Sequence, residues 1–470
     1  MTSGESEWDD DFQLDELISR FDEMVRNGGD GYFDSEEFEE LYSFFTETQK
    51  QEKARLVLEK ALKLHRNNYR IKLLWAKQLA DDGHLSKAIK VLDDIENEEP
   101  EDSDIYLMKG AVYNMMLNFA KSVEEYEKAL MLADEDEMEE LYVTIALQYE
   151  NLGEFDKALS YLQKAMEYTE SPDQILSEIG LCFEMAERIE DGITFFQQYL
   201  EKNPTNHAAW FNLGLAFYHL QLYEKAIDAM EYALSIEESY LPAIINIGQL
   251  YSTLGNYHKA LEYFHESEQY EEADSLTLYY MGECHEKMLD FEEALLFYRK
   301  AIAKDEYFAD AWAGMGVIYD EKGETRKAIH YLEKAIELDS FNNEFHLIIA
   351  DLFIKIKRFD KAREHYQVVE ENDPFDPDLW KDYAYMHIAS GEIEKAVQIL
   401  KTGLIHQPNN PGLLYRLVAA LMLNKKPDQA YEYLELALSI DFEGHTDLYD
   451  FMPALKDNPR VTELILQFAP

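Results

Sequence analysis

A period of 34 residues runs through most of this 470-residue sequence. One small residue, usually alanine, recurs at steps of 34, 34 and 36 residues and then at eight further steps of 34. Its positions are Ala54, Ala88, Ser122, Ala158, Gly192, Ala226, Ala260, Ala294, Ala328, Ala362, Ala396 and Ala430. Length alone would predict about three globular domains. Twelve copies of one short unit instead indicate a repeat protein, in which each unit buries its apolar side against its neighbours.

Each copy contains two helical patterns separated by a short turn. The segment 207–239 is typical, because apolar residues at helical spacing stand on both sides of a break at Gln221. These residues are Trp210, Leu213 and Phe217 before the break, and Tyr223, Ala226, Met230 and Ala233 after it. Spacing of this kind places the apolar residues on one face of a helix. The sequence therefore predicts an all-α fold of helical hairpins.

Glycines also recur at the repeat period, within the first helix of several copies. They are Gly110, Gly180, Gly214, Gly248, Gly282 and Gly316. Glycine inside a helix costs about 1 kcal/mol relative to alanine, so its recurrence indicates a packing requirement. We expect each glycine to face the second helix of its own hairpin, where a larger side chain would hold the two axes more than about 10 Å apart.

The period, the aromatic-leucine-glycine first helix and the alanine-aromatic-alanine second helix resemble tetratricopeptide repeats. The resemblance implies a right-handed α-solenoid superhelix of about twelve hairpins, with first helices on the concave face and second helices on the convex face. Three copies depart from the pattern, at Tyr42, Tyr199 and Val418, and we expect local packing to differ there. The acidic leader and the segment 32–45 also look like long cytoplasmic repeat proteins of the Bacteroidota.

The ends of the chain have the pattern of caps, which cover the terminal repeats of a solenoid. We expect an acidic, disordered leader over residues 1–10, an amphipathic capping helix and turn over 11–34, repeats over 35–444, and capping helices over 445–470. Apolar stripes support both caps. They consist of Leu14, Leu17, Ile18, Phe21 and Val25 at one end and Val461, Leu464, Ile465 and Phe468 at the other.

The charge of the chain narrows the choice of partners. With 43 basic and 95 acidic residues, the formal net charge is −52, which repels nucleic acid phosphates and anionic lipids. We expect neither nucleic acid nor a membrane as partner, and a protein or peptide partner, with a basic one favoured by charge. Acidity that serves only solubility is the alternative. The repeat pattern leaves the oligomeric state open.

Cysteine usage and hydropathy predict a soluble, cytoplasmic protein. Cys182 and Cys284 are too few for a disulfide framework, and we expect both to be buried thiols. The acidic start lacks the basic residues of a secretory signal, and no apolar run reaches the length of about 18 residues that a transmembrane helix needs.

Two local motifs imitate ligand sites. Residues 29–38 copy the second half of a calcium-binding EF-hand loop, but Arg26 and Gly28 stand where the first two carboxylates should be. Residues 314–319 have the glycine spacing of a dinucleotide site but lie in a predicted helix without a preceding strand. The histidines show no zinc-binding spacing. We therefore expect no metal, no cofactor and no enzymatic activity.

The predicted binding site lies on the first helices of copies six to eight. Asn212 and Asn246 share one phase, 34 residues apart, and an asparagine there could bond the backbone of an extended peptide through its donor and its acceptor. A solvated asparagine without a ligand is the alternative. The surrounding residues on this face are Phe211, Leu215, Tyr218, Ile245, Gln249, Tyr279 and Tyr280. They would anchor peptide side chains, or else only line a tight superhelix.

The sequence therefore predicts a scaffold that binds an extended peptide or protein segment in the concave groove. The alternative is a structural or assembly adaptor with an empty groove, acting through the convex face or the acidic N-terminal end. Residues 1–40 contain 15 acidic residues against Arg20 and Arg26. Strong salt sensitivity of binding would favour the adaptor, since exposed charges are screened over about 8 Å at physiological ionic strength.

Overall fold

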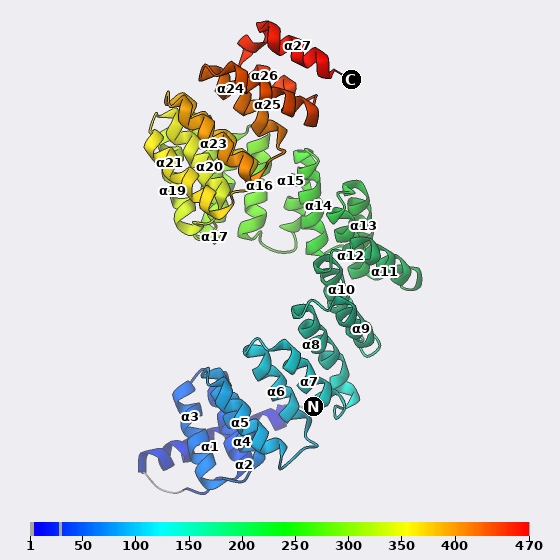
Figure 1. The fold of residues 1–470 in the computed structure, drawn as a ribbon. Coiled ribbons are helices and arrows are strands. Elements are labelled where there is room, and N and C mark those ends of the chain that lie inside the picture. The colour runs from blue at the N-terminus through cyan, green and yellow to red at the C-terminus, as the bar shows by residue number, and fades with distance from the viewer. Residues whose placement is uncertain (1–3, 28–30, 470) are drawn as a thin grey trace. The chain divides into compact units, whose positions relative to one another are not determined.

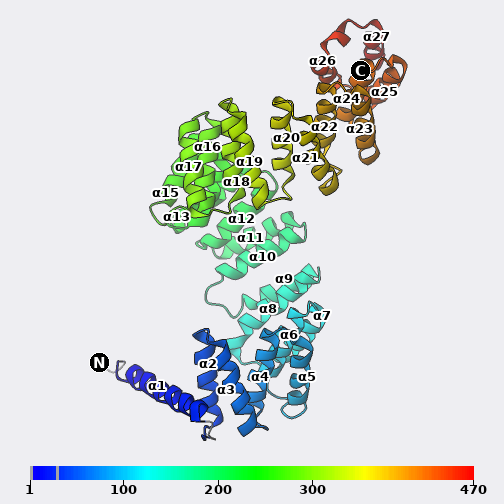
Figure 2. The ribbon, with the colours of Figure 1, turned by 90° about the vertical axis from the view of Figure 1, so that its left-hand side faces the viewer.

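The computed structural model describes residues 4–27 and 31–469, which form helices joined by short turns. The chain divides into two compact units, 1–238 and 239–470, each described by itself below. Within unit 1, successive hairpins stack in chain order (Figures 1 and 2). Its helices are α1 (Gly4–Asn27), α2 (Ser35–Glu47), α3 (Gln51–Leu64), α4 (Tyr69–Asp81), α5 (Leu85–Glu96), α6 (Ser103–Met115), α7 (Phe119–Leu130), α8 (Met138–Asn151), α9 (Phe155–Ala165), α10 (Asp173–Met185), α11 (Ile189–Lys202), α12 (His207–His219) and α13 (Tyr223–Ile236).

Unit 2 continues the same alternation of first and second helices and ends in two further helices. Its helices are α14 (Leu241–Thr253), α15 (Tyr257–Ser267), α16 (Ser275–Lys287), α17 (Phe291–Lys304), α18 (Ala309–Glu321), α19 (Thr325–Leu338), α20 (Asn343–Lys355), α21 (Phe359–Asn372), α22 (Pro377–Ala389), α23 (Ile393–His406), α24 (Pro411–Leu423), α25 (Pro427–Ile440), α26 (His445–Phe451) and α27 (Pro459–Phe468). Short 3₁₀ helices cover Glu135–Glu137 and Pro453–Asp457. The described residues contain helices and no strands, which confirms the predicted all-α fold.

Most of the glycine column packs as predicted. A Cβ added to Gly110, Gly248 or Gly282 would lie 2.6 Å from a ring carbon of Tyr126, Phe264 or Tyr298, each on the second helix of the same hairpin. Gly214 and Gly316 face Met230 and Leu332 in the same way. Contacts this close are not available to a real side chain, so the glycines allow the two helices of a hairpin to approach each other.

The lysines that precede the small-residue column lie over aromatic rings. The Nζ atom of Lys259 lies 4.6 Å from the ring centroid of Tyr251. The corresponding distances are 4.9 Å between Lys157 and Tyr149 and 5.1 Å between Lys327 and Tyr319. Lys157 and Lys327 also pair with glutamates. A cation over a ring and beside a carboxylate is held by its own repeat. These lysines therefore have a local packing role.

The two ends of the chain carry additional helices. The helix α1 spans Gly4–Asn27, and no Gly or Pro after Gly4 interrupts it before Asn27. Its Leu17 and Phe21 are buried against the first hairpin, whereas Val25 is exposed. At the other end Val461 and Leu464 of α27 are buried. The residue boundaries of the caps and of the repeat region stay predictions.

Candidate functional site

The hairpin of α10 and α11 departs from its neighbours at two positions of α11. Gly192 and Tyr199 stand where other second helices carry fully buried alanines, such as Ala226 and Ala233 in α13. Tyr199 is half-buried and its ring stacks on Phe195 at 6.5 Å. A tyrosine cannot fill the space that an alanine occupies. The helix α10 accordingly packs on α12, the first helix of the next hairpin, as well as on α11.

Two contacts show how closely α10 approaches α12. Gly180 does not follow the rest of the glycine column: the nearest atom to a Cβ added there would be Oδ1 of Asn212 on α12, at 2.9 Å, ahead of the Phe196 ring at 3.6 Å. Gly180 thus contacts its own second helix, as predicted, but its closer contact is with the first helix of the next hairpin. At the start of both helices, Asn206 accepts a hydrogen bond from the Ala209 amide (2.7 Å) and donates one to Asp173 (2.9 Å).

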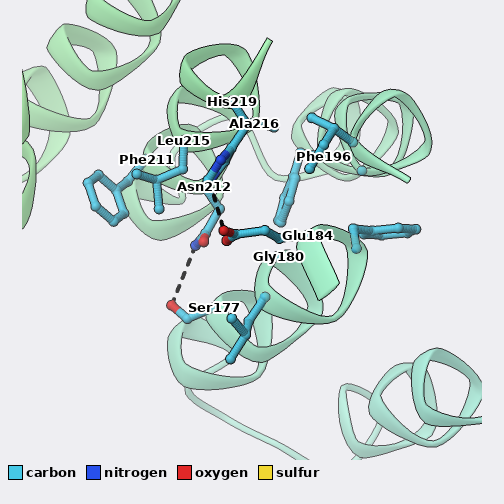
Figure 3. A pocket seen from close by; sticks show the side chains of 13 residues that line it. Ser177, Gly180, Glu184, Phe196, Phe211, Asn212, Leu215, Ala216 and His219 are labelled. Atoms are coloured by element: carbon cyan, nitrogen blue, oxygen red, sulfur yellow. Dashed lines mark hydrogen bonds and ion pairs between the residues drawn. The ribbon is translucent and has the colours of Figure 1, made fainter. Parts of the chain in front are cut away.

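A cavity of about 190 Å³ lies between α10, α11 and α12 (Figure 3). Its walls are mainly apolar, with four polar side chains from α10 and α12. The lining residues are Ser177, Gly180, Leu181, Phe183, Glu184, Ile189, Gly192, Phe196, Phe211, Asn212, Leu215, Ala216 and His219. Ligand cavities for whole small molecules measure roughly 300 to 1,000 Å³, so this cavity has the size for one apolar side chain.

The polar side chains form two pairs that connect α10 and α12 (Figure 3). Asn212 is only 4% exposed, and its Nδ2 donates to the Ala208 carbonyl at 2.8 Å and to Ser177 Oγ at 3.5 Å. Nearer the other end of α12, His219 Nε2 lies 3.3 Å from Glu184 Oε2, and both of these side chains are partly exposed. The cavity thus has an apolar interior with polar groups at its edges, an arrangement typical of sites that orient an apolar group.

Three of the predicted site residues line this cavity: Phe211, Asn212 and Leu215. Tyr218 follows on the same helix but is 42% exposed and is not among the lining residues. Its ring makes an edge contact with the His219 ring at 5.7 Å. Tyr218 thus lies outside the cavity wall, and its predicted place on the peptide-binding face stays a prediction.

The remaining predicted residues lie on α14 and α16 of unit 2. Ile245, Asn246 and Gln249 are half-buried on α14, and Nδ2 of Asn246 donates to the Pro242 carbonyl at 2.8 Å. The ring of Tyr279 stacks on Tyr298 at 5.6 Å, and the ring of Tyr280 on Phe264 at 6.0 Å.

Burial, with a smaller contribution from Glu283, raises the pKa of Tyr279 well above its ordinary value. Both tyrosine rings thus contribute to packing against second helices. Asn212 belongs to unit 1 and Asn246 to unit 2, so binding of one peptide backbone by both asparagines stays a prediction.

Sequence reasoning missed Ser177, Glu184 and His219 as neighbours of Asn212. Their own sequence contexts carry no signal, because each reads as a polar residue on a helix surface. The useful signal was the irregular copy itself, in which Tyr199 replaces the usual alanine.

The EF-hand-like segment falls partly outside the described residues, since these exclude 28–30. Glu37, the expected last ligand, is engaged elsewhere: its Oε2 accepts from the Asp34 amide (2.9 Å) and its Oε1 from Arg20 (2.8 Å). This is a capping box at the start of α2. Across the described residues, no three His, Cys, Asp or Glu side chains gather as a metal site would require.

The segment 314–319 lies inside α18, where Gly316 packs on Leu332. It therefore belongs to a hairpin rather than to a phosphate-binding turn. None of the described helices combines the length and the apolar character that crossing a membrane requires.

Hairpins of two helices, stacked in steps of 34 residues, define an α-solenoid repeat protein. Sequence models of the tetratricopeptide repeat match residues 143–207, 186–239, 241–274, 276–305, 314–377 and 387–449. The chain belongs to the tetratricopeptide repeat family, as its sequence pattern predicted.

Several solved structures are similar to this chain at low sequence identity. The Cut9-Hcn1 hetero-tetramer of APC/C has 14% identity, covers 87% of this chain and 94% of its own, and gives a TM-score of 0.42. A tetratricopeptide repeat protein from Parabacteroides merdae has 14% identity over 54% of this chain and 99% of its own, with a TM-score of 0.43. The human IFIT1 dimer with m7Gppp-AAAA has 17% identity, covers 74% of this chain and 94% of its own, and gives a TM-score of 0.40. No curated protein sequence matches the chain.

Proposed function

We propose that this protein is a non-enzymatic scaffold that binds an extended peptide or protein segment along the face formed by its first helices. The observation that carries the proposal is the cavity between α10 and α12, which are first helices of consecutive hairpins. An apolar side chain of the partner would enter this cavity. In unit 2 the corresponding face carries Ile245, Asn246, Gln249, Tyr279 and Tyr280.

The polar groups of the cavity support binding rather than nucleophilic chemistry. Ser177 Oγ donates to the Asp173 carbonyl at 3.1 Å, four residues earlier on its own helix, while His219 contacts Glu184. A serine nucleophile would instead be hydrogen-bonded to its general base. These side chains connect two helices and frame an apolar opening.

The test is to fill the cavity and measure peptide binding. Ala216 is nearly buried in its wall, and Ala216→Leu places three additional carbon atoms there. Peptides would first be selected on the wild-type chain from a random nine-residue phage library and then measured by fluorescence anisotropy. We expect Ala216→Leu to weaken their binding at least tenfold, and Ser235→Leu, on the exposed surface of α13, to leave it unchanged.

If Ala216→Leu fails to fold, as judged by circular dichroism, Leu215→Ser provides a second variant of the same wall. Unchanged binding by a folded cavity variant would contradict the proposal. Binding that survives these variants but disappears in high salt would favour the alternative of an adaptor acting through its acidic N-terminal end.

A further inference from the structure

A second, acidic cavity also borders α10, on the side of α8. It measures about 570 Å³ and is formed by the first halves of α8 and α10. Five carboxylates line it, and the described residues of its wall include no Lys or Arg. The acidic lining residues are Asp136, Glu139, Glu140, Asp173 and Glu178. Like charges gathered this way raise the local concentration of cations and favour a positively charged group.

These carboxylates are only partly compensated by the protein. Asp173 has a hydrogen bond from Asn206 and lies 3.6 Å from His207 Nε2. Within the described part of the chain, no ion pair with Lys or Arg engages Glu139, Glu140 or Glu178. The acidic cavity therefore has negative charge that a partner can neutralise.

A buried carboxylate between the same two helices adds to this charge. Glu150 of α8 is 7% exposed, and its Oε1 has no hydrogen-bond partner among the described residues. Burial, followed by repulsion from Glu178, raises the pKa of Glu150 to about 6. Glu178, which lines the acidic cavity, therefore also repels the carboxylate of Glu150.

The helix α10 is common to the acidic cavity and the apolar one. It contributes Asp173 and Glu178 to the first, and Gly180 and Glu184 to the second. Packed helices lie about 8 to 10 Å apart, and the two sets of residues are displaced by roughly 8 Å along α10 at 1.5 Å per residue. The cavity centres are therefore on the order of 12 Å apart. An extended peptide spans this in three or four residues at about 3.3 Å each.

We propose that the partner segment carries a bulky apolar residue and a lysine or arginine three or four residues away, the apolar side chain entering the cavity of α10 to α12 and the basic one the cavity of α8 and α10. This inference rests on the proposed function and specifies the chemistry of its ligand. According to this inference, the face formed by the first helices of unit 1 binds a basic, extended peptide. The apolar contact supplies the anchor, and the charge pairing sets which peptides are accepted.

The experiment uses the full chain and fluorescein-labelled nine-residue peptides in a polyserine background. The reference peptide has Leu at position 3 and Lys at positions 6 and 7. One control replaces Leu by Ser, and another replaces both lysines by Glu. We expect the reference to bind at least tenfold more tightly than either control, with affinity falling as salt rises from 50 to 500 mM, a range over which the screening length shortens to a few Å.

A charge-neutral variant separates the two parts of the inference. Glu139→Gln/Glu140→Gln/Glu178→Gln should abolish the preference for Lys over Glu and keep the preference for Leu over Ser. A matched variant neutralises three exposed acids of other helices, Glu124→Gln/Glu190→Gln/Glu231→Gln, and should keep both preferences. Equal binding of the Lys and Glu peptides, or a Lys preference that survives the first variant, overturns the inference alone. Failure of every peptide, including those selected from the library, overturns the proposed function as well.

Discussion

Gly180 of α10 faces Asn212 of α12 so closely that a methyl group added to the glycine would lie 2.9 Å from Oδ1 of the asparagine. The Nδ2 of this asparagine donates a hydrogen bond to the Ala208 carbonyl at 2.8 Å, so a methyl group at position 180 would have to displace the amide end of the side chain from this position. The other glycines of the column allow the two helices of one hairpin to approach each other. Gly180 instead allows two first helices to approach, and the cavity lies beside this contact.

Gly180→Ala should change the cavity more than the stability. The added methyl group meets the end of a side chain, and its strain is partly offset by the gain of about 1 kcal/mol in helix propensity. We expect the free energy of unfolding to change by less than about 1 kcal/mol, while binding of cavity-dependent peptides weakens as Asn212 shifts. Urea unfolding and fluorescence anisotropy measure the two effects.

Gly214→Ala is the matched comparison on α12. Its Cβ would lie 2.7 Å from Met230 Cγ and 3.1 Å from the Ala226 carbonyl oxygen, which belongs to the backbone of the same hairpin. Backbone cannot relax as a side chain does, so this variant should lose about 1 to 3 kcal/mol of stability. Equal losses in the two variants would contradict the distinction between the two glycines.

Glu150→Gln should stabilise the protein at neutral pH. The pKa of Glu150 is raised to about 6, so the folded protein holds its proton more tightly than the unfolded chain does. Stability therefore falls as pH rises from about 4.5 to about 6, and the loss above this range is on the order of 2 kcal/mol. The variant avoids that loss, which urea unfolding at pH 7.5 would detect.

The pH dependence provides the control for Glu150→Gln. At pH 4 the wild-type side chain is protonated in both states, and the two proteins should have similar stability. Glu124→Gln, at an exposed position of α7, should have little effect at either pH. A gain for Glu150→Gln that is equal at pH 4 and pH 7.5 would show that something other than the buried charge is responsible.

The sequence predicted the hairpins and most of the glycine contacts because these recur at one period. A repeated pattern reports a repeated environment, as at Gly248 and Phe264. Phe211, Asn212 and Leu215, which line the cavity, were placed together for the same reason, from their phase on a first helix, and their part in peptide binding stays a prediction.

The cavity itself depends on a departure from the period. Tyr199 indicates that packing differs in this copy, but the position of α10 depends on several contacts together, among them Gly180 with Asn212. Ser177 and His219 line the cavity because of this position of α10 beside α12. The asparagine amide also has a partner that the phase argument did not consider, the Ala208 carbonyl one turn earlier. Local hydrogen bonds of this type compete with any ligand.

A histidine pair in unit 2 should make the protein sensitive to mild acid. Nδ1 of His346 on α20 lies 2.9 Å from Nδ1 of His365 on α21. Burial and the neighbouring His346 lower the pKa of His365 to about 4, and burial lowers that of His346 as well. In the unfolded chain His365 binds a proton from about pH 6.5 downward, whereas in the folded protein it does so only near pH 4. Stability is therefore complete above pH 6.5 and is lost progressively below it.

His365→Phe removes this titration and keeps the ring that stacks on Phe353 at 5.6 Å. The fall in unfolding free energy between pH 7 and pH 5 should be smaller in this variant than in the wild type, by about 2 kcal/mol. Urea unfolding at the two pH values measures it. His258→Phe, at an exposed position of α15, should retain the wild-type slope. An unchanged slope in His365→Phe would exclude the pair as the source.

The two cysteines should react with thiol reagents only when their surroundings open. Cys182 on α10 and Cys284 on α16 are free and fully buried, as the sequence predicted. Burial, with a smaller contribution from Glu150, raises the pKa of Cys182 to about 12. Burial likewise raises the pKa of Cys284 to about 11. Because the thiolate is the reactive form, both side chains are protected by exclusion of reagent and by protonation.

We expect less than one thiol per chain to react with Ellman's reagent within an hour at pH 8, and two in 6 M urea. Cys182→Ala and Cys284→Ala leave one thiol each, so the slow native-state rate of each variant reports opening of a different unit. Glu150→Gln in the Cys284→Ala background should slow the reaction of Cys182 further, because loss of the buried charge stabilises the closed state, in which the thiol is inaccessible even though its pKa falls. Rapid reaction of either thiol in native buffer would contradict its burial, and an unchanged Cys182 rate would contradict the effect of Glu150.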